Sequence, residues 1–186
     1  MAERNSGSLT RIRFAVVTLS DRRAYDGGPD GSGPLIRQML EPGMSQVAAT
    51  LLPDDQGAIE AELRRLCDDG ICDLVLTTGG TGLSPRDVTP EATRAVIDRE
   101  VPGMAEAIRA AGMAHTPRAM LSRAVCGLRG QTLIVNLSGS PRAVREQLEV
   151  LLPVLPHAVQ VASGVPQDCA RDSHCACAER VEGGTT

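Results

Sequence analysis

Length, composition and charge exclude several classes of protein before any motif is considered. The chain has 186 residues, enough for one domain with a sizeable core and too few for two ordinary domains. A net charge of −4 argues against a general nucleic-acid or membrane-surface binder, and no apolar run approaches the roughly 20 residues that span a bilayer. Because the first residues lack the apolar core of a signal peptide, we expect a cytoplasmic protein.

The chain contains no lysine, since all 19 basic residues are arginine. This excludes a P-loop, a kinase of the protein-kinase type and a Schiff-base enzyme, each of which needs a lysine. With one Phe, one Tyr and no Trp, almost no side chains are available for stacking on bases or other flat rings. Any phosphate charge must therefore be met by arginine, backbone N–H groups or a metal.

Strands and helices are predicted to alternate along most of the chain. Apolar runs bounded by turn formers predict strands at 13–19, 46–52, 71–78, 124–128 and 131–137. Apolar residues at helical spacing predict helices through 35–40 and 59–67, at 90–98 and 103–113, from 141 and at 153–162, with a further helical turn at 117–121. This alternation predicts an α/β three-layer sandwich with helices on both faces of a mostly parallel sheet, and the last two strands form a hairpin that adds an antiparallel member.

The chain is predicted to consist of one domain with a loose segment at each end. Residues 1–10 are polar and small and are expected to be flexible, 11–164 form the domain, and 165–186 are expected to be a disordered tail. Residue types that bind metals occur in the tail at a spacing that matches no zinc module, so we interpret them as incidental: Asp168, Cys169, His174, Cys175 and Cys177. Cys67, Cys72 and Cys126 are expected to be buried reduced thiols.

Four predicted strands end in polar loops, at 20–34, 53–55, 79–88 and 138–142. In an open parallel sheet such loops gather at the carboxyl edge, where ligands bind. The segment 20–22 (Ser20, Asp21 and Arg22) is equally compatible with a turn and with substrate binding. The segment 138–142, with Ser138, Gly139 and Ser140, opens a helix whose free N–H groups suit an anion, although Ser140 could serve only as a helix cap.

The central motif is the glycine-rich loop of Gly79, Gly80, Thr81 and Gly82, which follows a buried strand. Glycine lets the backbone approach a phosphate and turn its N–H groups toward it, so we interpret the loop as a phosphate cradle rather than a plain turn. The next helix is predicted to begin at 89–91, with the hydroxyl of Thr89 as its cap and Pro90 as its first residue.

Asp54 and Asp87 lie in loops that follow neighbouring strands and could flank one phosphate. Carboxylates beside a polyphosphate usually hold Mg²⁺, which keeps most of its waters and bridges to the phosphates. The alternatives are a helix cap for Asp54, which Asp55 could supply equally well, and an Asx-turn for Asp87. Together with the glycine loop, the pair favours a metal site. His115 and His157 are interpreted as surface or packing residues.

Residues 76–84, 86–91 and 98–103 resemble the molybdopterin adenylyltransferase family (MogA/MoaB-type), the molybdenum cofactor biosynthesis domains that also include the G domain of gephyrin. The segments 20–22, 30–34, 52–55, 121–123 and 139–141 support the resemblance, which covers about 11–164 in order. Two positions depart from the pattern, because family members often have Pro where Ser138 stands and Lys where Arg142 stands. The Cys-containing tail is also not part of the pattern.

The resemblance implies Mg²⁺-dependent transfer of AMP from ATP to the terminal phosphate of molybdopterin, with release of pyrophosphate. It places the family's two functionally important aspartates on Asp54 and Asp87. Substrate binding is expected at Ser20, Asp21, Arg22, Gly79, Gly80, Thr81, Gly82, Glu100, Ser138, Gly139 and Ser140. It also implies a homotrimer or hexamer, possible contact with other molybdenum-cofactor enzymes, and no nucleic acid or membrane partner. The alternative is an oligomeric paralogue that binds molybdopterin for a partner enzyme without adenylylating it.

With so few aromatic residues, we expect the pterin to be held by hydrogen bonds from backbone and polar side chains. The one tyrosine, Tyr25, is not expected to stack on it.

Overall fold

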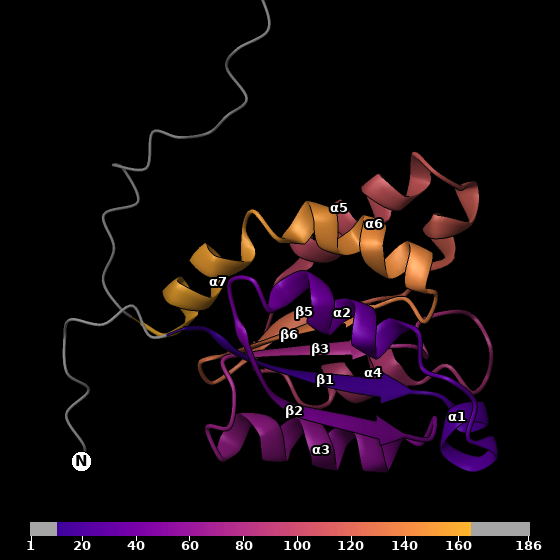
Figure 1. Cartoon of the computed structure of the whole chain (residues 1–186), viewed down its shortest axis with the longest axis horizontal. Coiled ribbons are helices and arrows are strands. Elements are labelled where there is room, and N and C mark those ends of the chain that lie inside the picture. Colours follow the sequence, from indigo (N-terminus) through magenta and orange to yellow (C-terminus); the bar gives the residue numbers. More distant parts are fainter. Residues whose placement is uncertain (1–10, 165–186) are drawn as a thin grey trace, which may run out of the picture.

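Six strands form one sheet in the order β2-β1-β3-β6-β5-β4, and helices cover both of its faces (Figure 1). The computed structural model describes residues 11–164, so the predictions for 1–10 and for the tail with Cys169, His174, Cys175 and Cys177 lie outside the described residues. The strands are β1 Arg13–Leu19, β2 Ser45–Leu52, β3 Leu74–Thr78, β4 Arg99–Glu100, β5 Cys126–Arg129 and β6 Thr132–Leu137. The helices are α1 Asp21–Asp26, α2 Ser32–Leu40, α3 Gln56–Asp68, α4 Thr89–Arg94, α5 Pro102–Met113, the 3-10 helix η1 Pro117–Leu121, α6 Pro141–Leu151 and α7 Leu155–Ala162.

The predicted sandwich is confirmed. Strands β2, β1, β3 and β6 run parallel, β5 pairs antiparallel with β6, and β4 pairs antiparallel with β5. Helices α2, α5, α6 and α7 lie on one face of the sheet, and α3 and α4 lie on the other (Figure 1). No helix in the described part of the chain is long and apolar enough to cross a bilayer.

The central strands are buried on both faces, which explains their continuous apolar runs. Alternate residues of β1 enter two separate clusters: Phe14 and Val16 pack beneath α2 and α6, whereas Ala15 and Val17 pack against α3. All five residues of β3 are buried. The sheet therefore forms a rigid middle layer whose strand ends are fixed by packing on both sides.

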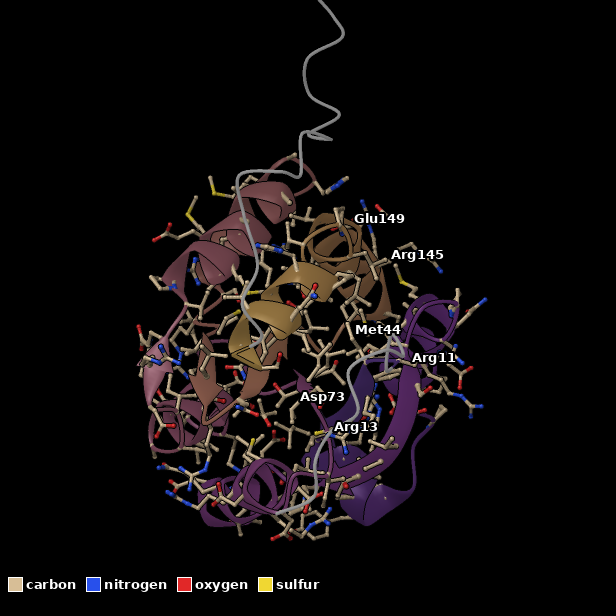
Figure 2. The ribbon with its side chains drawn as sticks, turned by 90° about the vertical axis from the view of Figure 1, so that its left-hand side faces the viewer. Arg11, Arg13, Met44, Asp73, Arg145 and Glu149 are labelled. Atoms are coloured by element: carbon tan, nitrogen blue, oxygen red, sulfur yellow. The ribbon has the colours of Figure 1, made fainter. Side chains whose placement is uncertain are left out.

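The amino edge of the sheet is closed by ion pairs. Arg13, at the start of β1, places Nη2 2.7 Å from Oδ1 of Asp73, just before β3, and the two side chains meet at this end of the molecule (Figure 2). Arg129 places both Nε and Nη2 2.7 Å from the carboxylate oxygens of Asp68. These arginines tie neighbouring elements together where the parallel strands begin.

Two sequence-based predictions about local structure were wrong. The loop at 20–34 contains α1 and the start of α2, because the Ser20 hydroxyl accepts a hydrogen bond from the Arg23 N–H and Gly27 ends the helix at a φ of 71°. The helix predicted at 90–98 ends at Arg94, and the following chain turns to form the two-residue strand β4. Neither element is long enough to give a periodic signal.

A buried asparagine joins the helix that follows the glycine-rich loop to the sheet. Asn136 on β6 donates from Nδ2 to the hydroxyls of Thr77 on β3 (3.0 Å) and Thr93 on α4 (2.9 Å). Its Oδ1 accepts from the Val125 N–H at 3.1 Å. The side chain is fully buried, so each of these groups depends on it for a partner.

We therefore expect Asn136→Ala to lower the free energy of unfolding by roughly 2–3 kcal/mol, because buried donors and acceptors lose their partners. Urea unfolding followed by circular dichroism measures the change. Gln131→Ala, an exposed residue in the turn before β6, is the control and should change stability little. Equal effects of the two substitutions would contradict a structural role for the Asn136 network.

Candidate active site at the carboxyl edge of the sheet

The loops that follow β1, β2, β3 and β6 meet at the carboxyl edge of the sheet, as predicted. The Ser20 N–H donates to the Leu52 carbonyl at 3.0 Å, which joins the loops after β1 and β2. The Gly79 N–H donates to the Leu137 carbonyl at 3.2 Å, and the Thr78 hydroxyl donates to the Ser138 carbonyl at 2.7 Å. The parallel strands thus bring residues that are far apart in sequence to one place.

The glycine-rich loop has a backbone that only glycine adopts readily. Gly79 and Gly80 have φ values of 109° and 62°, and a Cβ atom on Gly79 would lie 2.2 Å from the Leu19 carbonyl oxygen. The N–H groups of Gly80, Thr81 and Gly82 donate to no acceptor among residues 11–164. The loop therefore presents a run of unused donors, which supports its interpretation as an anion cradle.

Thr89 has a different role from the one predicted. It lies inside α4 rather than at its cap, and Val88 is the residue before the helix. The buried Thr89 hydroxyl donates to the Gly79 carbonyl at 2.9 Å, and the Thr89 N–H donates to the Gly80 carbonyl at 3.1 Å. Both bonds anchor the glycine-rich loop to the helix that follows it.

Asp54 and Asp87 flank the glycine-rich loop. A Cβ atom on Gly80 would lie 3.1 Å from Oδ1 of Asp54, and a Cβ atom on Gly82 would lie 3.0 Å from Oδ2 of Asp87. The Oδ1 atom of Asp54 is buried and has no hydrogen-bond partner in the described structure. A buried, unpartnered carboxylate oxygen is costly unless a cation or a donor occupies the adjacent space.

The structure shows whether Asp54 caps a helix and whether Asp87 closes a turn. Asp55, not Asp54, caps α3, because its side chain accepts from the Ala58 N–H at 2.8 Å. Asp87 does close a turn, since its Oδ2 accepts from the Ser84 N–H at 2.8 Å. This bond occupies one oxygen of Asp87 and leaves Oδ1 without a protein donor within the described chain.

Asp21 links the first two loops to the third. Its N–H donates to Oδ2 of Asp54 and its Oδ1 accepts from the Asp54 N–H, both at 2.9 Å. Arg86, next to Asp87, donates from Nε and Nη2 to the Asp21 carboxylate, also at 2.9 Å. The Ser20 hydroxyl caps α1, which agrees with the interpretation of this segment as a turn. The pairing of Arg86 with Asp21 was not predictable from the sequence, because the two residues are 65 positions apart.

Asp54 and Asp21 belong to one cluster of carboxylates, together with Asp87, but their electrostatic surroundings differ. Burial raises the pKa of Asp54, and the charges of Asp21 and Asp87 raise it further, against the opposing hydrogen bond from the Asp21 backbone and the charge of Arg86. The hydrogen bonds from Arg86 lower the pKa of Asp21, with help from the Asp54 backbone N–H. Asp21 is thus neutralised by its own arginine, whereas Asp54 has negative neighbours and an unpartnered oxygen.

A cavity of about 310 Å³ lies beside the glycine-rich loop, between α5, η1 and α6. Thr81 and Gly82 border it on one side, and residues 138–140 border it on the other. Gln147 fixes Ser138 there, since the Ser138 N–H donates to Oε1 at 3.0 Å and Nε2 donates to the Ser138 hydroxyl at 2.8 Å. Gln147 was not predicted to belong to the site, because a polar residue within a helix has no distinctive sequence pattern.

The other residues predicted to bind substrate, Ser140, Arg22 and Glu100, lie in different parts of the structure. Ser140 stands at the cap position of α6, yet its side chain makes no capping hydrogen bond, so its hydroxyl remains available. Arg22 is exposed on α1. Glu100 lies on β4, at the opposite edge of the sheet from β2, where it pairs with Arg94 at 3.2 Å. The structure therefore does not bring Glu100 to the glycine-rich loop.

Comparisons with known proteins identify the family to which the chain belongs. Residues 15–157 match the family model described as "Probable molybdopterin binding domain". A molybdopterin adenylyltransferase from Helicobacter pylori is 38% identical over 84% of this chain and 90% of that protein. The molybdenum cofactor synthesis protein cinnamon of Drosophila melanogaster is 42% identical over 82% of this chain, which spans only 26% of that longer protein.

The crystal structure of a molybdopterin biosynthesis enzyme, MoaB from Thermus thermophilus, is also similar. It is 49% identical, with a TM-score of 0.79 over 83% of this chain and 98% of that one. The family match covers most of the described residues, and both the sequence and the structural similarity extend over most of the chain. The chain belongs to the molybdopterin-binding domain family.

Proposed function

We propose that this protein is a molybdopterin adenylyltransferase of molybdenum cofactor biosynthesis, which transfers AMP from ATP to the terminal phosphate of molybdopterin and releases pyrophosphate. One observation carries the proposal. The N–H groups of Gly80, Thr81 and Gly82, which have no acceptor within residues 11–164, lie between two carboxylates, and one of these has a buried oxygen without a partner in the same part of the chain. Relatives 38% identical over 84% of the chain carry the name of this activity.

The residues present fit a Mg²⁺ ion. Among residues 11–164 there is no group of three or more His, Cys, Asp or Glu side chains that could form an all-protein metal site. Mg²⁺ does not require one, because it is commonly held by one or two carboxylates together with substrate phosphates and water. Oδ1 of Asp54 and Oδ1 of Asp87 are the oxygens that would hold it. When bound, the ion would neutralise the phosphate charge of ATP beside these carboxylates.

The chemistry needs no activated side chain. An oxygen of the molybdopterin phosphate is already anionic and forms a bond to the α-phosphorus of ATP, while the bond from that phosphorus to the bridging oxygen breaks and pyrophosphate leaves. The N–H groups of Gly80, Thr81 and Gly82 would stabilise the charge that develops on the α-phosphate oxygens. Holding the two anionic substrates in one orientation supplies much of the remaining acceleration.

The cavity between α5 and α6 is the proposed pterin site. It borders the glycine-rich loop, so a molecule that fills it would present its phosphate to the donors of that loop. No aromatic residue among residues 11–164 lines the cavity, and Tyr25 is 73% exposed on α1. Polar groups such as the hydroxyls of Ser138 and Ser140 and the amide of Gln147 would therefore recognise the pterin edges.

We further propose that the protein is cytoplasmic and works as a homotrimer or a pair of trimers. Other enzymes that use the molybdenum cofactor would be its partners. The second candidate function, molybdopterin binding without adenylylation, is favoured by the cavity itself, which would hold the pterin whether or not transfer follows.

Asp87→Asn should lower AMP transfer by at least ~100-fold, because it removes one of the two carboxylate charges beside the phosphates. Molybdopterin binding should stay unchanged, since asparagine keeps an oxygen that can accept from the Ser84 N–H. The measurement is release of pyrophosphate from ATP in the presence of molybdopterin, with binding determined separately. Asp55→Asn is the matched control, because asparagine also caps helices and Asp55 is not part of the cluster.

Tight molybdopterin binding without AMP transfer by the wild type would instead establish the binding function. Transfer that is equal in the wild type and Asp87→Asn would exclude the proposed role of the carboxylate pair.

Asp54→Asn should abolish activity and yet stabilise the protein without ligands at neutral pH, by roughly 0.5–1 kcal/mol, since solvent weakens the repulsion that is removed. A carboxyl whose pKa is raised on folding costs stability when it is ionised, so the gain should be present above the folded-state pKa of Asp54 and disappear as the pH falls below its unfolded value. Urea unfolding of both proteins across this pH range measures the difference. A destabilised Asp54→Asn would contradict the unfavourable electrostatics.

A further inference from the structure

One arginine spans both ends of the loop that carries Asp87. Arg123 lies between η1 and β5, and its Nε donates to the Gly82 carbonyl at 2.7 Å. Its Nη2 donates to the Asp87 carbonyl at 2.5 Å, and its Nη1 donates to the Glu91 carboxylate on α4. The Arg123 N–H also donates to the Thr81 carbonyl at 2.9 Å. All three guanidinium nitrogens are therefore used on the segment from the glycine-rich loop to α4.

These contacts fix the distance between the two ends of an exposed turn. Residues 83–86 are exposed. Within the turn, the Ser84 N–H donates to Oδ2 of Asp87, the Asp87 N–H donates to the Ser84 carbonyl and the Arg86 N–H donates to the Ser84 hydroxyl. Outside the turn, the Arg86 side chain pairs with Asp21. A guanidinium is planar and holds its donors at fixed angles, so the two carbonyls bound to it cannot move apart independently. Because the Asp87 carboxylate faces Gly82, the same contact sets where that carboxylate stands relative to the glycine-rich loop.

Arg123 is itself held in place. Arg109 on α5 donates from Nη1 to the Ala124 carbonyl at 3.1 Å, on the residue that follows Arg123. Glu91 receives the third guanidinium contact, and although burial raises the pKa of Glu91, the hydrogen bond from Arg123 and nearby positive charges outweigh it, so the net pKa is lowered. The anchor on α4 is therefore an ionised carboxylate, which forms a stronger hydrogen bond than a neutral group.

Arg123 is poorly placed to bind a substrate phosphate directly. Its three nitrogens already have protein acceptors, and it does not line the cavity beside the glycine-rich loop. It borders a different hollow of about 270 Å³, toward β4. Its effect on the site must therefore act through the backbone that it holds.

We propose that Arg123 is a positioning residue, which holds the Asp87 carboxylate at the place beside the glycine-rich loop that adenylyl transfer requires. The inference rests on the proposed function, because it assigns Arg123 to the same reaction. Lysine cannot replace it, since an ammonium on a flexible stem cannot hold two carbonyls and a carboxylate in one plane.

The experiment compares Arg123→Gln and Arg123→Lys with Arg129→Gln. Arg129 is a matched control, because its guanidinium also contacts one carboxylate, of Asp68, and one carbonyl, of Val96, but lies at the amino edge of the sheet. A general loss of stability from a missing arginine clamp should therefore appear in all three variants. Hydrogen exchange of the amides of residues 83–88 is measured in the protein without ligands, and AMP transfer is measured over a range of Mg²⁺ and molybdopterin concentrations.

Both Arg123 variants should speed exchange of these amides by about tenfold or more and lower kcat on the order of 10- to 100-fold. They should also raise the Mg²⁺ concentration needed for half-maximal rate, while KM for molybdopterin changes less than about twofold. Binding of Mn²⁺ with a non-hydrolysable ATP analogue, followed by electron paramagnetic resonance, should weaken in parallel. Arg129→Gln should leave all of these quantities unchanged.

Unchanged exchange or unchanged metal dependence in Arg123→Gln, with an active wild type, would overturn this inference and leave the proposed function intact. Full activity of Arg123→Lys would overturn the requirement for the planar guanidinium. A wild type that binds molybdopterin without transferring AMP would overturn the proposed function, and this inference with it.

Discussion

The carboxyl edge of the sheet is defined by repulsion between carboxylates that the fold holds close together. Asp54 and Asp87 lie on either side of the glycine-rich loop, and Asp21 is hydrogen-bonded to Asp54 through the backbone. Of these three aspartates, only Asp21 has a cationic partner within residues 11–164, namely Arg86. The repulsion that remains is tolerated because two buried clusters and the Asn136 network hold the strand ends where they are. Such local instability within a well-packed frame is typical of sites that bind charged ligands.

Apart from the Arg86–Asp21 pair, arginine has different roles at the two edges of the sheet. At the amino edge, Arg13 and Arg129 each meet a carboxylate, so charge is cancelled within the protein. At the carboxyl edge, Arg123 mainly contacts backbone carbonyls, and the N–H groups of Gly80, Thr81 and Gly82 have no acceptor within residues 11–164. A chain without lysine thus leaves backbone dipoles, rather than a mobile ammonium, to face an incoming phosphate.

The parts of the fold that could be predicted are those with a long, continuous hydrophobic pattern in the sequence. Strands such as β1 and β3 are buried on both faces, so their apolar runs are unbroken, and the alternation with helices was enough to predict the sandwich. The six-residue α1 and the two-residue β4 depend on a single cap or on pairing with a distant strand, and they were missed. Thr89 was assigned to a helix cap because the sequence does not reveal that its hydroxyl faces Gly79.

The site residues also divide into those that the sequence indicates by themselves and those whose role depends on distant partners. Asp54 and Asp87 could be selected from the sequence, because an acid beside a predicted phosphate-binding loop is chemically unusual in any fold. Arg123 and Gln147 act on groups contributed by other loops, at sequence separations of 36 and 9 residues, and nothing in their neighbours indicates these partners. Residues that would meet a substrate can thus be recognised from their own chemistry. Residues that position them can be recognised only from the structure, because their partners are backbone groups on other loops. For this reason the structure around Asp87 adds Arg123, which the sequence did not indicate.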